Sequence, residues 1–97
     1  MSVRVFIKRT IPEDKKKEVL PLMIKLRAIA THQPGYICGE TLVNANDLEE
    51  FVVISTWKDL DTWTAWKTSP QREDIDFQIK DILGNEAGYQ SYFSGIL

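Results

Sequence analysis

Five side chains in this sequence are suited to acid–base chemistry or to holding a ring. His32 is the only histidine, and histidine is the side chain that most readily changes charge near neutral pH, so it is the candidate general base. Removing a proton from a phenol or hydroquinone makes an electron-rich anion that can react with molecular oxygen. Trp66 can stack on a flat aromatic ring. Tyr36 and Tyr92 can donate hydrogen bonds to an oxygen, and Arg72 can hold an anionic one.

Each of these residues also has a structural interpretation, and the sequence leaves both open. His32 follows a predicted helix, where a histidine often only meets the negative end of the helix dipole. Trp63 and Trp66 can be core side chains packed against a sheet. The tyrosines and Arg72 can be structural or solvated. Trp57 ends a predicted strand and is expected to pack rather than to bind.

Composition excludes several classes of function. The chain has 97 residues, which fits one domain over residues 1–97. Twelve basic and fourteen acidic residues give a net charge of −2, which argues against a nucleic acid partner. One histidine and one cysteine are too few for a usual zinc or iron site, so no metal is expected. No secretion signal or membrane-spanning run is recognised, and we expect a cytoplasmic protein without a membrane partner.

The hydrophobic pattern predicts four strands and three helices. Val3, Val5 and Ile7 point one way and Arg4, Phe6 and Lys8 point the other, as in a strand with one buried face. The predicted strands cover residues 3–9, 36–43, 51–57 and 89–93, the last running towards Leu97. Thr10 and Glu13 have the spacing of a capping box, so a helix is expected to start near residue 11 and to continue through a proline kink. Further helices are expected after Asp59 and over residues 71–83.

The order of these elements, βαββαβ, is that of an α+β ferredoxin-like domain. It implies a four-stranded antiparallel sheet with the helices on one face. In the third strand Phe51, Val53 and Trp57 point to one face, while Val52 and Ile54 point to the other. Because helices cover only one face, a second copy of the chain is the expected cover for the other, giving a homodimer. The alternative is a monomer with a wet aromatic face.

Several short stretches of the sequence together resemble those of a known protein family. They are residues 33–36 (QPGY), 39–42 (GETL), 54–57 (ISTW), 63–66 (WTAW) and 69–70 (SP). The chain resembles the antibiotic biosynthesis monooxygenase (ABM) family of the dimeric α/β-barrel superfamily. The resemblance implies a homodimer, a dimeric α/β barrel whose two sheets pack face to face, with a pocket between sheet and helices in each subunit. Family members that are enzymes oxidise quinol-like or polycyclic aromatic molecules with oxygen, often without metal or flavin.

The haem-degrading branch of the family is not expected here. That branch uses an asparagine late in the first strand, a tryptophan at the end of the short helix and a histidine further along. Trp66 matches the tryptophan, but Lys8 and Arg9 occupy the late positions of the first strand. The region around Asp76 has no histidine, so the haem ligand is missing.

The resulting prediction is a cofactor-independent monooxygenase acting on a small aromatic molecule. His32 and Trp66 are the predicted catalytic residues, and Tyr36, Arg72 and Tyr92 the predicted substrate-binding residues, with no cofactor. Two other functions stay open: a non-catalytic dimeric module that binds a small molecule, and a cofactor-free isomerase or lyase.

Overall fold

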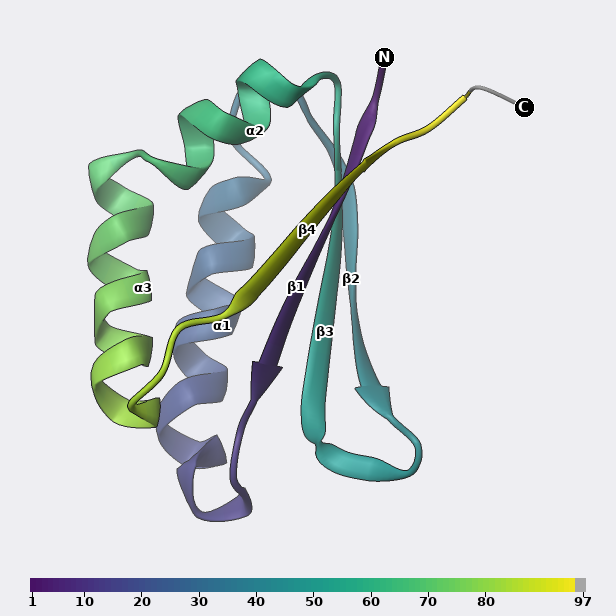
Figure 1. Ribbon diagram of the computed structural model, residues 1–97. Helices are drawn as coiled ribbons and strands as arrows, with labels where there is room; N and C mark the ends of the chain where they lie inside the picture. The colour runs from purple at the N-terminus through teal and green to yellow at the C-terminus, as the bar shows by residue number, and fades with distance from the viewer. Residues whose placement is uncertain (96–97) are drawn as a thin grey trace.

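A computed structural model describes residues 1–95 and shows one sheet with helices on one side (Figure 1). The strands are β1 (Val3–Thr10), β2 (Tyr36–Asn44), β3 (Asp47–Trp57) and β4 (Gly88–Phe93). The helices are the short 3-10 turn η1 (Glu13–Lys15), α1 (Lys16–Ala30), α2 (Leu60–Lys67) and α3 (Pro70–Leu83). The end of the predicted domain, and of the strand expected to run towards Leu97, lies outside the described residues.

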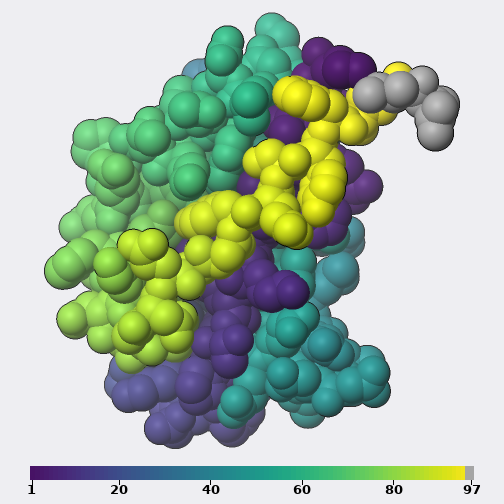
Figure 2. All heavy atoms as spheres, in the orientation of Figure 1, coloured from purple at the N-terminus to yellow at the C-terminus, as the bar shows by residue number. Residues whose placement is uncertain are grey.

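The sheet confirms the predicted ferredoxin-like arrangement. All neighbouring strands are antiparallel and their order is β2-β3-β1-β4. In the orientation of Figure 2, the helices α2 and α3 (green) lie on one side and the hairpin of β2 and β3 (teal) reaches the other. Ile7 of β1 pairs with Val53 of β3 and with Tyr89 of β4. This register places one row of side chains from three strands beneath the helices.

The helix ends follow local signals, with one exception. Ser69 caps α3 by accepting from the backbone N–H of Arg72 at 3.3 Å, and Gly84 ends it with a φ of 78°. Helical structure begins at Glu13, near the expected residue 11, but the predicted capping box of Thr10 and Glu13 was wrong. Thr10 is still paired in β1 opposite Glu50, and the N–H of Glu13 donates to the side chain of Glu49 at 3.1 Å instead. Because β3 supplies that acceptor, the chain does not need Thr10 as a cap.

Helix α2 begins where Asp59 accepts a hydrogen bond from the backbone N–H of Thr62 at 2.8 Å. This bond lowers the pKa of Asp59 below its ordinary value of 3.8, because the N–H favours the charged carboxylate. Gly35, with a φ of 84°, packs against the Thr62 side chain, and its carbonyl accepts from the N–H of Lys58 at 2.7 Å. A side chain at Gly35 would collide with Thr62, so this close approach fixes where β2 starts relative to α2.

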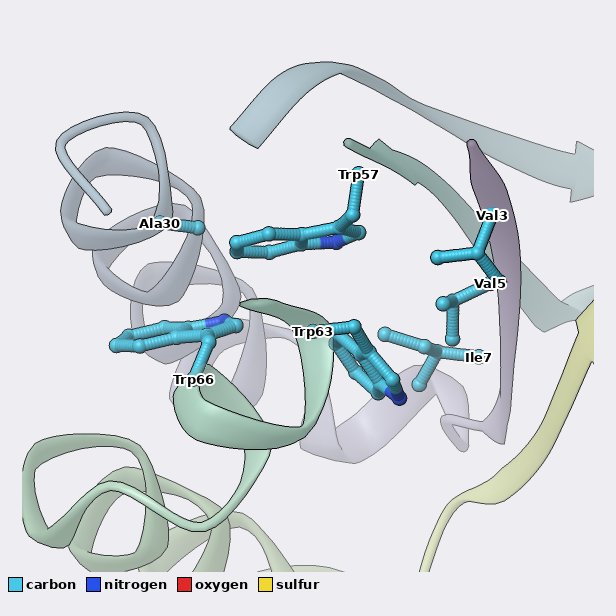
Figure 3. Close-up of a cluster of buried hydrophobic side chains, with 7 residues drawn as sticks. All are labelled: Val3, Val5, Ile7, Ala30, Trp57, Trp63 and Trp66. Atoms are coloured by element: carbon cyan, nitrogen blue, oxygen red, sulfur yellow. The ribbon is translucent and has the colours of Figure 1, made fainter. Parts of the chain in front are cut away.

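The core lies between the helices and the sheet (Figure 3). One cluster joins Val3, Val5 and Ile7 of β1 to Trp57, Trp63, Trp66 and Ala30. A second cluster joins Ile11, Val19, Phe51, Ile75 and Ile79, where α1 and α3 meet the other end of the sheet. Helix α1 continues through Pro21, as its apolar stripe predicted. None of the helices in residues 1–95 is long and apolar enough to cross a membrane.

The other face of the sheet carries an apolar patch beside polar side chains, among them Lys8 and Glu50, which lie 3.9 Å apart. Val52 and Ile54 lie on this outer face, as their alternation with Val53 predicted, and line a shallow hollow of about 710 Å³ with Phe6 and Leu42. The rings of Phe6 and Tyr92 meet edge to face at 5.4 Å between centroids. No helix of the described chain covers this face (Figure 1).

Candidate functional site

A cavity of about 340 Å³ lies between α1, α2 and the helix-facing side of the sheet. Most of its surface is apolar, and the main contributors from the helices are Leu20, Met23, Ile24, Leu26, Ala30 and Trp66. Ile7, Val53 and Trp57 form the wall on the sheet. The volume is at the lower end of the range for small-molecule sites, roughly 300–1,000 Å³. A compact, largely apolar ligand fits such a space.

Trp66 lines this cavity from α2 and is 2% exposed, so only a small part of its ring meets the open space. Trp66 and Trp63 both project from α2, but Figure 3 shows them diverging: Trp66 lies below the ring of Trp57, and Trp63 lies beside Ile7. Trp66 and Trp57 line the cavity, whereas Trp63 does not. Trp57 packs in the core, as the sequence predicted, and it also lines the cavity.

Arg72 and Arg9 are buried at the same cavity and share one carboxylate. Arg72 is 3% exposed and Arg9 is 6% exposed. The Nε of Arg72 donates to Oδ2 of Asp76 at 2.9 Å, and Nη2 of Arg9 donates to Oδ1 of the same side chain at 3.0 Å. Nη2 of Arg72 also donates to the hydroxyl of Tyr89 at 3.0 Å. Two cations thus meet one anion beneath the helices, which leaves an excess positive charge there.

The guanidinium of Arg72 is also packed among aromatic faces. Its central carbon lies 5.1 Å from the ring centre of Trp63, 5.8 Å from that of Trp66 and 5.7 Å from that of Tyr89. Cations at such distances are attracted to the ring faces. The arginine is therefore held by its surroundings and presents a fixed charge next to Trp66.

The side of the cavity near β2 carries hydroxyl groups and a third arginine. Tyr36 lines the cavity and its ring meets Trp57 edge to face at 5.3 Å. Its hydroxyl lies close over Gly39, where an added Cβ would come within 2.7 Å of it. Arg27 of α1 donates through Nη2 to the hydroxyl of Thr41 at 2.9 Å, joining the helix to the edge strand.

The remaining polar group in the sheet wall is Ser55. It is buried, and its hydroxyl accepts a hydrogen bond from the indole N–H of Trp57 at 3.0 Å. That contact leaves the serine hydroxyl proton available to a further acceptor, which a ligand oxygen can supply. The side chains that line the cavity within residues 1–95 include no histidine, aspartate or glutamate.

The structure brings three of the five predicted site residues together and leaves two apart. Tyr36, Trp66 and Arg72 line the cavity. His32 lies just beyond the end of α1, is exposed, and is not part of the cavity wall. That position matches its structural interpretation as a residue at the helix C-terminus. Tyr92 is 52% exposed on the outer face of the sheet and donates to Gln90 at 3.2 Å.

Sequence reasoning missed Arg9, Ser55 and Arg27. A signal was present for Arg9, because it continues the alternation of Val3, Val5 and Ile7 and so points to the buried face. Ser55 likewise shares its face with Val53 and Trp57. For Arg27 no comparable signal exists, because an arginine on a helix usually faces solvent. Within the described residues no three His, Cys, Asp or Glu side chains converge as metal ligands do.

The fold and site together define a class: a ferredoxin-like α+β domain with an apolar, arginine-containing cavity between its sheet and helices. Residues 2–75 match the sequence profile of the family described as "Antibiotic biosynthesis monooxygenase". The match covers most of the chain, and the chain therefore belongs to this family. No curated protein matches the sequence significantly.

Solved structures share the fold over nearly the whole chain. A conserved protein from Methanosarcina mazei Go1 superposes with a TM-score of 0.86 at 20% identity, covering 95% of this chain and 91% of that one. A structure described as an antibiotic biosynthesis monooxygenase gives 0.83 at 17% identity, covering 96% and 98%. SnoaB from Streptomyces nogalater, described as a cofactor-independent oxygenase, gives 0.74 at 16% identity, covering 99% and 92%. At these identities the similarity shows a common fold.

Proposed function

We propose that this protein is a monooxygenase that oxidises a small phenolic or quinol-like aromatic molecule with molecular oxygen, using neither metal nor flavin. The observation that carries the proposal is the cavity itself. It is apolar, it has Trp66 on one wall, and its polar groups are hydroxyls and guanidinium groups that can hold an oxygen atom of the substrate. Membership of the ABM family supports the reaction class.

The chemistry can be balanced from substrate and oxygen alone. The hydroxyl proton passes to solvent water, since no histidine or carboxylate lines the cavity within residues 1–95, and the resulting phenolate has an electron-rich ring carbon that forms a bond to one atom of O₂. The hydroperoxide that results loses the hydrogen on that carbon and breaks its O–O bond, releasing water and leaving a carbonyl. A phenol and one O₂ thus give a quinone and one water. The substrate supplies all the electrons, so no external reductant is required.

The cavity residues support these steps by position and charge. Trp66 and the apolar wall hold a flat ring. Arg72, whose charge is fixed beside Trp66, stabilises the phenolate as its proton leaves. Tyr36 and Ser55 supply further hydroxyl groups in the lining. His32 has no role in this proposal because it lies outside the cavity wall.

Oxygen uptake tests the proposal. Purified protein, treated with a chelator, is incubated with a panel of naphthols and hydroquinones in an oxygen electrode, and quinone is followed by absorbance. We expect one O₂ consumed per quinone formed, at a rate proportional to protein concentration. A His32→Ala variant should keep the full rate. The proposal fails if no phenol of the panel is oxidised faster than in buffer.

That failure would leave the alternatives. A binding module without catalysis would show ligand-induced thermal stabilisation and no turnover. A cofactor-free isomerase or lyase needs a placed acid or base, and the cavity wall in residues 1–95 offers no histidine or carboxylate for this role. The second alternative is therefore the less favoured of the two.

The same proposal includes a homodimer that closes the outer face of the sheet. Leu42 is 46% exposed there, beside the apolar hollow formed with Phe6, Val52 and Ile54. Apolar patches of this kind are uncommon on monomers. A second copy, packed sheet against sheet, is the cover that we propose.

A further inference from the structure

Arg9 is buried with most of its hydrogen-bonding capacity unused. The hydrogen bond that the structure gives it uses Nη2 alone, towards Asp76. Arginine has five N–H donors on three nitrogens, so Nε and Nη1 have no acceptor within residues 1–95. No fully buried side-chain nitrogen of the described chain lacks a partner, so both nitrogens reach one of the two hollows that Arg9 lines, this cavity or the one beside Asp76. Arg72 has Nη1 free in the same way, because Nε and Nη2 are engaged.

The charges around the cavity are of one sign. Its wall contains Arg9, Arg27 and Arg72 and, within residues 1–95, no carboxylate. Asp76 neutralises one of the two buried arginines from behind. An uncompensated buried cation is costly unless it acquires an anionic partner. The cavity is therefore suited to a ligand that brings one negative charge.

A second hollow, also lined by Arg9 and Asp76, has a balanced set of charges, unlike the cavity. Its other charged lining residues are Lys67, Lys80, Glu73 and Glu86, two of each sign. This hollow has no comparable preference for an anion. The positive excess belongs to the cavity that also holds Trp66.

We propose that Arg9 and Arg72 form an anion subsite that takes the carboxylate of an aromatic acid, with the ring of that acid against Trp66. A carboxylate fits better than a phenolate for two reasons. A carboxylate has two charged oxygens and can accept from both arginines at once, as the carboxylate of Asp76 does. A carboxylic acid is also ionised at neutral pH without help from a base, whereas a phenol is not. The substrate class is thus a phenol or quinol that carries a ring carboxylate.

This inference rests on the proposed function only in placing the substrate in the same cavity, and its test measures binding without turnover. Calorimetric titration under nitrogen compares 2-naphthoate with 2-naphthamide and 2-naphthol, which share its size and ring. We expect 2-naphthoate to bind about tenfold or more tightly than either neutral analogue, as for hydrogen bonds to a charged group. Equal affinities for 2-naphthoate and 2-naphthamide would overturn the inference.

Variants locate the effect. Arg9→Gln removes the unused donors and should abolish most of the preference for 2-naphthoate over 2-naphthamide, while leaving the affinity for 2-naphthamide nearly unchanged. Arg9→Lys keeps the charge but has a single nitrogen, and should recover only part of the preference. Arg4→Gln, an exposed arginine of the same strand, is the matched control and should change nothing. If Arg9→Gln folds and retains the full preference, the subsite is not there. If Arg9→Gln does not fold, the same comparison with Arg72→Lys decides.

The two proposals fail separately. Oxidation of plain naphthols without any preference for 2-naphthoate would overturn the anion subsite and leave the oxygenase. A preference for 2-naphthoate that depends on Arg9, with no oxygen uptake on any phenol, would support the subsite and overturn the oxygenase.

Discussion

Arg9 of β1 and Arg72 of α3 donate hydrogen bonds to the two different oxygens of the Asp76 carboxylate, at 3.0 and 2.9 Å. The first contact spans 67 positions of sequence and the second spans one helical turn. The pair ties the end of β1 to α3 directly beside the cavity. Its stability and its charge are therefore linked to whatever the cavity binds.

We predict that Asp76→Asn destabilises the protein by about 2–3 kcal/mol, because it leaves two buried guanidinium groups without a counter-charge. The measurement is the urea midpoint of unfolding. Glu86→Gln is the control, since the exposed pair of Lys80 and Glu86, 3.0 Å apart, is expected to contribute less than about 1 kcal/mol. Equal effects of the two substitutions would show that the buried network adds no special stability.

Gly39 and Tyr36 provide a second prediction. A Cβ at position 39 would lie 2.7 Å from the tyrosine hydroxyl, so Gly39→Ala must displace Tyr36 and should cost about 1–3 kcal/mol. In a Tyr36→Phe background the hydroxyl is gone, and the same substitution should cost clearly less. Chemical unfolding of the four proteins of this double-mutant cycle measures the difference. If the changes in the free energy of unfolding are strictly additive, the alanine at position 39 does not collide with the Tyr36 hydroxyl.

The Asp59 cap predicts a dependence of stability on pH. Hydrogen bonding from Thr62 lowers the pKa of Asp59 below 3.8 in the folded state. A carboxylate with a lowered folded-state pKa stabilises the fold above its unfolded-state pKa, and this contribution is lost as the pH falls through the lowered value. Thermal unfolding of Asp59→Asn should therefore differ from the native protein at neutral pH and converge with it below pH 3.8. A constant difference across that range would contradict the assignment.

The outer face predicts the oligomeric state. We expect the native chain to sediment as a dimer at micromolar concentration and Leu42→Asp to sediment as a monomer, because a charge would be buried between the sheets. Phe77→Asp is the control: Phe77 is 67% exposed but lies on α3, away from that face. A native chain that is monomeric and well folded would remove the proposed sheet-to-sheet contact.

Local signals in the sequence predicted most of the fold, and contacts between distant segments account for what they missed. Ser69 and Gly84 act within one or two turns of α3, and their roles as cap and stop were confirmed. The expected cap at Thr10 was wrong, because Glu49 of a distant strand supplies the acceptor instead.

The same distinction explains the site. Trp66 could be predicted as a site residue from its position on the helix. The alternation of side chains along β1 already placed Arg9 on the buried face. The partnership of Arg9 with Asp76 could not be predicted, because it depends on how β1 and α3 meet in three dimensions. His32 was predicted as a general base from its side-chain chemistry alone. The sequence did not show that the cavity lies elsewhere.

The two buried tryptophans of α2 provide the most direct test of whether the substrate is oxidised in this cavity. Oxygen uptake with the best naphthol is compared in the native protein, Trp66→Phe and Trp63→Phe, of which only Trp66 lines the cavity. We predict that kcat/KM falls at least about threefold in Trp66→Phe, by the loss of ring stacking, and falls less in Trp63→Phe, where phenylalanine keeps an aromatic face against Arg72. Native activity in Trp66→Phe, or a selective loss in Trp63→Phe, would contradict the claim that this cavity is where the substrate is oxidised.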